Sequence, residues 1–141
     1  MNYIENYSLL FTDSLFANTV FYGDTEMVLD VMISVGGYDK IMMFLSATLG
    51  YAVSVLVNYW FGRVLFKIYN SSIDNPIAAE NYKSMQEGMQ KFGWLMLCFN
   101  MVPAIGPFLS VIASFIDFGI KRTLFFAVVA RMVYYFWVLV Q

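Results

Sequence analysis

The feature that most constrains this chain is a run of 22 residues without a charge, at 41–62. A helix of about 20 apolar residues is long enough to cross the hydrocarbon core of a bilayer. A second apolar run, at 123–140, contains a single charged residue, Arg131, and directly follows two basic residues. Basic residues at the end of an apolar run are typical of the membrane–water boundary. We therefore predict one transmembrane helix at 41–62 and another at 122–140.

The composition indicates a polytopic membrane protein. Of the 141 residues, 60% are hydrophobic and 13% are charged, against about 45–50% and about 25% in soluble domains. We predict one all-α membrane domain covering 1–141. A net charge of −2 gives no basic surface of the kind that nucleic-acid binders use, so we expect no nucleic acid as a partner. The first residues are acidic and polar rather than basic, so we expect no cleaved targeting segment.

Residue usage excludes several kinds of chemistry. The chain has no histidine and a single cysteine. Histidine is the commonest metal ligand and general base, and one cysteine cannot form an internal disulfide. We therefore expect no metal ion, no cofactor and no catalysis of the Cys/His or Ser/His type.

Two pairs of shorter apolar runs flank the first span, one pair within 8–38 and one within 92–118. Each run is too short to cross a bilayer alone. The second pair is divided by "PAIGP", whose two prolines should stop a helix because proline lacks the N–H that a helix needs. We predict that each pair forms a re-entrant helical hairpin. The turns are expected at Gly23, Pro103, Gly106 and Pro107. Bent backbone at membrane depth must be buried in protein or line a wet cavity, so the turns mark a site.

A polar connector at 63–91 separates the two halves, and a surface helix is expected after Pro76. The basic residues on the connector side are Arg63, Lys67, Lys83, Lys91, Lys121 and Arg122, whereas the other side has only Lys40. Loops rich in Lys and Arg stay in the cytoplasm, so the connector is predicted to be cytoplasmic. Hairpin and span then occur twice with opposite orientation. Inverted repeats with broken helices are an architecture of transporters.

The first hairpin carries three acids, Asp24, Glu26 and Asp30. If the helix starts at Thr25, Glu26 and Asp30 share one face. Two carboxylates close together in a low dielectric should not both ionise, so one is a candidate proton carrier. Arg131 is the candidate partner, because an arginine in mid-membrane is costly unless it is paired. In the alternative reading, the acids lie at the interface and cap the short helix.

Small residues recur along the first span, where Gly50, Ser54 and Gly62 would let another helix pack closely. The stretch "LGYAVSVLVNYWFGR" combines them with Tyr59 and Arg63. This spacing resembles the DedA family of bacterial inner-membrane proteins, which share a VTT or SNARE-associated domain with eukaryotic lipid scramblases.

Two further motifs carry the same resemblance, which covers roughly 15–140. "MQKFGWLMLCFNMVP" is similar to the family's basic residue and glycine before a Pro-Gly turn, and "YGDTE" to a first-hairpin motif ending in an acid, here Glu26. The length is most similar to the short YqaA-type branch. The resemblance implies opposed re-entrant hairpins and proton-linked movement of lipids or lipid phosphates across the bacterial inner membrane. Many members have arginine where this chain has Asn100 and Gly106, which leaves Arg131 and Arg63 as candidate phosphate ligands.

These observations predict a transporter or scramblase for a lipid, a lipid phosphate or an amphipathic anion, not an enzyme. Its partners would be membrane lipids and protons, with Glu26 and Asp30 exchanging protons and Arg131 holding the acid or the substrate. We also expect a homo-oligomer, because about two full spans can hardly enclose a lipid path. The alternative is a membrane assembly or scaffold subunit that transports nothing. An intramembrane enzyme built on the acids is the weakest reading.

Overall fold

The computed structural model describes residues 2–21, 26–72, 76–99, 105–115 and 117–141. Helices account for nearly all of these residues, and the described part of the chain contains no strand. The helices are α1 (Tyr3–Ala17), α2 (Met27–Val35), α3 (Lys40–Ser72), α4 (Pro76–Cys98), α5 (Gly106–Phe115) and α6 (Ile120–Val140). The predicted all-α class is therefore confirmed.

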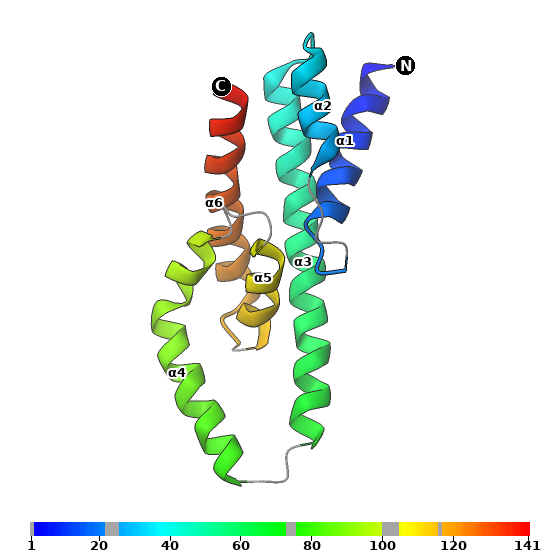
Figure 1. Cartoon of the computed structure of the whole chain (residues 1–141). Helices are drawn as coiled ribbons and strands as arrows, with labels where there is room; N and C mark the ends of the chain where they lie inside the picture. Colours follow the sequence, from blue (N-terminus) through cyan, green and yellow to red (C-terminus); the bar gives the residue numbers. More distant parts are fainter. Residues whose placement is uncertain (1, 22–25, 73–75, 100–104, 116) are drawn as a thin grey trace.

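Helix α3 is the central element (Figure 1). Its 33 residues extend over about 50 Å at 1.5 Å per residue. Helices α1 and α6 contact α3 toward its start and α5 contacts it toward its end, while α2 packs on α1, and α4 packs on α5 and α6. The start of α3 and the end of α6 lie at the same end of the molecule, which also holds the N-terminus (Figure 1).

Two helices are long and apolar enough to cross a membrane: Lys40–Ser71, within α3, and α6. They include the predicted spans at 41–62 and 122–140. Only 39% and 33% of their most apolar windows are buried inside this chain. A central helix of a soluble protein would bury most of such a surface. The two helices therefore present broad apolar faces to their surroundings.

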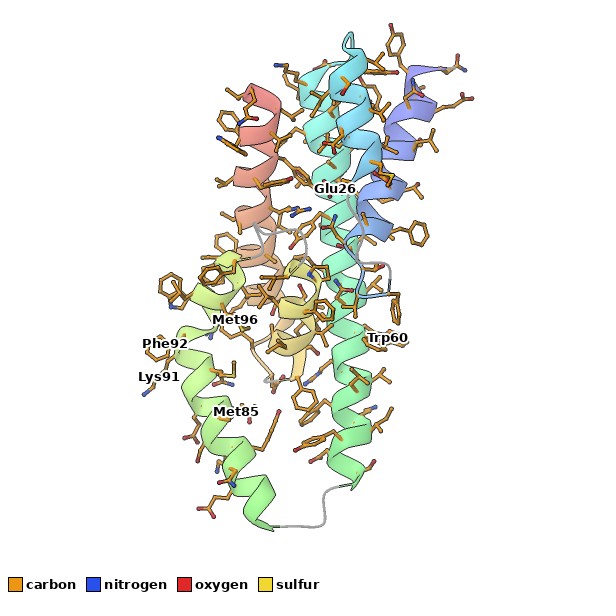
Figure 2. All side chains as sticks on the ribbon, in the orientation of Figure 1. Glu26, Trp60, Met85, Lys91, Phe92 and Met96 are labelled. Atoms are coloured by element: carbon orange, nitrogen blue, oxygen red, sulfur yellow. The ribbon has the colours of Figure 1, made fainter. Side chains whose placement is uncertain are left out.

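The segment predicted as a connector is mostly helical. Helix α3 continues for ten residues beyond Gly62, and α4 begins at Pro76 as expected but runs on to Cys98. The polar helix and the first leg of the second predicted hairpin are thus one helix, because no proline interrupts 77–98 and single glycines cost a helix only about 1 kcal/mol each. Figure 2 shows its two faces: Met85 and Met96 point toward the body of the molecule, while Lys91 and Phe92 point away.

The chain reverses direction at both places where a hairpin is predicted. Helices α1 and α2 run antiparallel, and α5 runs back along α4 after a break (Figure 1). Gly106 and Pro107 open α5 and are buried, and a proline in the first turn costs no helical hydrogen bond. The other two predicted turn residues, Gly23 and Pro103, lie outside the described residues.

Two glycines of α3 lie close to the backbones of neighbouring helices. A Cβ at Gly50 would lie 2.4 Å from the carbonyl oxygen of Phe11 in α1, and one at Gly62 would lie 2.7 Å from a carbonyl oxygen of α5. Only glycine lets the backbones approach this closely. Ser54 and Tyr59, the other members of the predicted packing set, are also buried.

Candidate functional site

A buried ion pair joins the two halves of the chain. The carboxylate oxygen Oε1 of Glu26 lies 3.3 Å from Nη2 of Arg131, although the residues are 105 positions apart. Glu26 is 9% exposed and Arg131 is 1% exposed. The partner that the sequence predicts for Arg131 is therefore present, and both charges are shielded by protein.

Glu26 reaches this place because it precedes α2 instead of lying within it. It occupies the N-cap position of α2, but its side chain makes no capping hydrogen bond. Asp13 of α1 takes over the capping task, since its Oδ2 accepts a hydrogen bond from the Val28 N–H at 3.0 Å. The carboxylate of Glu26 is thus available to the interior.

Three further donors converge on the same oxygen of Glu26. Asn18 Nδ2 donates to Oε1 at 2.5 Å, Ser14 Oγ lies 3.0 Å from it, and the hydroxyl of Tyr135 donates to it. Ser14 lies in α1, Asn18 at its C-terminal cap and Tyr135 in α6. Glu26 is therefore the point at which α1, α2 and α6 meet (Figure 2).

Two asparagines fix the turn that follows α1. Asn18 Oδ1 accepts a hydrogen bond from Arg131 Nη2 at 3.0 Å, so this side chain contacts both members of the ion pair. Asn58 of α3, 1% exposed, donates to the Asn18 carbonyl at 2.9 Å and accepts from the Val20 N–H at 3.0 Å. Backbone groups that leave a helix end would otherwise be unpaired in the interior. Asn58 satisfies them and positions Asn18.

Aromatic rings surround the guanidinium group. The Cζ atom of Arg131 lies 5.3 Å from the ring centre of Tyr51, 4.6 Å from that of Tyr134 and 5.2 Å from that of Tyr135. Ring faces attract a cation, and the attraction strengthens where water is excluded. The site thus offers Arg131 both a carboxylate and three π faces.

The hydroxyl oxygens of Ser14 and Tyr135 lie within hydrogen-bond distance of more oxygen atoms than their two protons can serve. Ser14 Oγ lies 2.9 Å from the Tyr135 hydroxyl and 2.9 Å from the Ala47 carbonyl oxygen, in addition to its contact with Glu26. With the contact between Tyr135 and Glu26, four oxygen–oxygen approaches share the two protons of Ser14 and Tyr135. Each hydroxyl supplies one proton. At most two of these four approaches are therefore hydrogen bonds donated by a hydroxyl group at any one time.

The two other acids of the first hairpin do not join Glu26. Asp30 is exposed on α2, and Asp24 lies outside the described residues. The predicted alignment of Glu26 with Asp30 on one helix face does not form, because α2 starts at Met27 and Glu26 itself has a non-helical ψ of 81°. A buried charge needs a partner of opposite sign. The partner of the Glu26 carboxylate is Arg131, not a second carboxylate.

Arg63 lies in a different environment. Its Nη1 is 2.9 Å from Oδ1 of Asp117, and both side chains are about half exposed, at 47% and 52%. Exposed pairs of this kind contribute little to stability. Nearby, Tyr82 of α4 donates to the Phe115 carbonyl, and burial, reinforced by the charge of Asp117, raises the pKa of the Tyr82 hydroxyl. This corner joins α3, α4 and α5, away from the buried pair.

The sequence did not single out Ser14, Asn18, Asn58 or Tyr135. Uncharged polar residues are common in apolar segments, and nothing in the sequence says which ones face inward. The available signal was the spacing of Ser14 and Asn18, four residues apart and therefore on one face of a helix. Among the described residues, no three His, Cys, Asp or Glu side chains gather into a group that could hold a metal ion.

Comparison with known proteins identifies a similar chain of nearly equal length. The protein is 28% identical over 135 residues to an uncharacterized protein of Rickettsia prowazekii, and the alignment covers 96% of this chain and 95% of that one. No family model matches the chain. No solved structure matches it.

Proposed function

We propose that this protein is a small transporter or scramblase of the DedA type, which moves a lipid, a lipid phosphate or an amphipathic anion across a bacterial inner membrane. Glu26 exchanges protons, and Arg131 alternately holds Glu26 and the anionic group of the substrate. The observation that carries the proposal is the buried pair of Glu26 and Arg131 in a chain with two helices long enough to cross a membrane.

The depth of the pair supports this role. Arg131 lies against Tyr51, which is 11 residues after Lys40 and 12 residues before Arg63 along α3. These separations correspond to about 17 Å and about 18 Å. If Lys40 and Arg63 mark the two membrane surfaces, the ion pair lies near the midplane. Ionisable residues at that depth are costly and are typical of pathways for ions and substrates.

The chemistry of the pair couples a proton to an anion. A glutamate can take up a proton, whereas an arginine keeps its charge at every accessible pH. When Glu26 is protonated, its carboxyl group no longer carries the negative charge that faces the guanidinium of Arg131. A phosphate group is one of the oxyanions that a guanidinium fork binds through two parallel hydrogen bonds. Protonation of Glu26 would therefore favour binding of an anionic substrate at Arg131.

The remaining parts of the proposal concern topology. Helix α2 has nine residues and α5 has ten, both too short to cross a bilayer. We take α1 with α2, and the end of α4 with α5, as re-entrant pairs of opposite orientation, related as an inverted repeat. The segment 63–91 would be cytoplasmic. Gly23 and Pro103 keep their predicted roles at the turns, and Asp24 keeps its predicted role in proton binding. Asp30 and Arg63 serve as secondary proton and anion contacts at the surface.

A flux assay tests the proposal. Proteoliposomes containing fluorescent phospholipids of several headgroups would be compared with empty liposomes, with and without a pH gradient. The site variant is the double substitution Glu26→Gln with Arg131→Met, because removing both members of a buried pair disturbs a fold far less than removing one. The matched control is Lys83→Gln with Glu87→Gln, which removes two exposed charges from α4.

We expect the parent and the control to exceed empty liposomes and the site variant to equal them. Parent flux equal to that of empty liposomes for every headgroup would refute transport. It would instead favour the assembly or scaffold role, for which the way the buried pair fastens α6 to α1 and α2 is the supporting observation. Parent and site variant with equal, substantial flux would show that the pair does not carry transport.

A further inference from the structure

Lys40 occupies an unusual place at the end of the molecule that holds the start of α3 and the end of α6. It lines two neighbouring grooves, one of about 320 Å³ between α3 and α6 and one of about 280 Å³ beneath the turn between α2 and α3. Among the described residues that line these grooves, Lys40 is the one with a charged side chain. Both grooves thus combine apolar walls with a single shared ammonium group.

The first groove extends from Lys40 toward the middle of the helices. Its walls include Phe44, one turn after Lys40 on α3, and Phe136, about one turn before the end of α6. Phe136 and Val140 are 64% and 65% exposed, so the groove is open to the surroundings. The second groove is also lined mainly by apolar residues, among them Met32 and Met43.

The ammonium group of Lys40 retains capacity for a ligand. One of its three hydrogens is donated to the Leu139 carbonyl at 2.8 Å, and no other partner of Lys40 occurs among the described residues. The neighbouring acid, Asp39, is already engaged, since its Oδ1 accepts the Ile41 N–H and caps α3. An anion at Lys40 would therefore meet two available N–H groups instead of an established ion pair.

We propose that this region binds one anionic phospholipid, with its phosphate on Lys40 and its acyl chains in the two grooves. Charge complementarity and the position of a cation at the head of two apolar grooves identify the ligand class. A phospholipid has this same arrangement of one anionic group and two apolar chains. The inference needs the membrane location proposed above but does not need transport, and it concerns a site separate from Glu26.

Tryptophan fluorescence provides the test. Trp137 lies one turn before Val140 on the same face of α6, whereas Trp60 points away from the body of the molecule (Figure 2). The protein would carry Trp60→Phe and Trp94→Phe, so that Trp137 is the single reporter. It would be placed in phosphatidylcholine vesicles containing increasing fractions of phosphatidylglycerol brominated on its acyl chains, or of brominated phosphatidylcholine. Bromine quenches a tryptophan that it contacts.

We expect brominated phosphatidylglycerol to bind next to Trp137 about fivefold more tightly than brominated phosphatidylcholine, the ratio for one lysine at a membrane surface. Lys40→Gln should reduce the ratio to one, while Lys67→Gln on the exposed end of α3 should leave it unchanged. In the parent, 1 M salt should also abolish the preference, because charges are then screened beyond about 3 Å. Equal quenching by both lipids, or a preference that survives Lys40→Gln and salt, would overturn the proposal. The measurement involves no flux, so its outcome is independent of the transport assay.

Discussion

Glu26 and Arg131 differ in what each can do when its partner is removed. A carboxylate left alone in the interior can take up a proton and become neutral, whereas a guanidinium cannot lose its charge. Arg131 is 1% exposed, so water does not replace a missing partner. The two residues are therefore unequal members of the pair, and the arginine is the one that depends on the other.

This asymmetry leads to a prediction about stability. Glu26→Gln should lower the free energy of unfolding by about 3–5 kcal/mol, because it removes the carboxylate of a buried, hydrogen-bonded ion pair. The double variant with Arg131→Met should lose less than the sum of the two single losses, by more than about 1 kcal/mol. Denaturant titration of the detergent-solubilised protein measures both values.

The control is the same comparison of single and double variants at Lys83 and Glu87, which are four residues apart and exposed on α4. There the two single losses of unfolding free energy should add up to the loss in the double variant to within about 0.5 kcal/mol. Additive losses at Glu26 and Arg131 would mean that the two charges do not stabilise each other.

Helix α3 contacts α1 and α5 at glycine residues. The glycines of the chain differ in how closely other atoms approach them. A Cβ at Gly50 would lie 2.4 Å from a backbone oxygen of α1, whereas one at Gly88 in α4 would meet nothing within 4 Å. Backbone atoms cannot move aside as the end of a side chain can. The same substitution should therefore have opposite effects at these two positions.

Gly50→Ala should destabilise the protein by about 1–3 kcal/mol, since α1 must move away from α3. Gly88→Ala should stabilise it by up to about 1 kcal/mol, since alanine is the better helix former and has room. Thermal unfolding of the two variants and the parent in one detergent gives the comparison. If Gly50→Ala proved as stable as Gly88→Ala, the close contact between α1 and α3 would be absent.

How much of this molecule the sequence predicts depends on the kind of interaction. The two long apolar helices follow from hydropathy alone, because a charge-free run such as 41–62 has few alternatives. The pairing of Glu26 with Arg131 follows from the cost of an isolated charge. The contacts of Asn18 and Asn58 could not be foreseen, since hydrogen bonds between neutral groups depend on which helices meet. The predicted common face of Glu26 and Asp30 does not form, because α2 begins at Met27, two residues after the expected start at Thr25.

The arrangement of the whole chain in a membrane can be tested by cysteine labelling. In a Cys98→Ser background, Tyr3→Cys and Gly37→Cys should react with a membrane-impermeant reagent from the outside, and Ser84→Cys from the cytoplasm. In the proposed topology, α1 and α2 return to the side they enter from, whereas α3 crosses. Reaction of positions 3 and 37 from opposite sides would show that α1 or α2 crosses alone. Reaction of positions 37 and 84 from the same side would show that α3 does not cross.

The two glycine contacts on α3 also determine how movements spread through the molecule. Gly50 and Gly62 are 12 residues apart, which on an α-helix corresponds to about 18 Å along the axis and a rotation of about 120°. Helices α1 and α5 thus pack against α3 at different positions along its axis and on different sides. A displacement of α1 would therefore affect α5 through a tilt or rotation of α3, not through direct contact between α1 and α5.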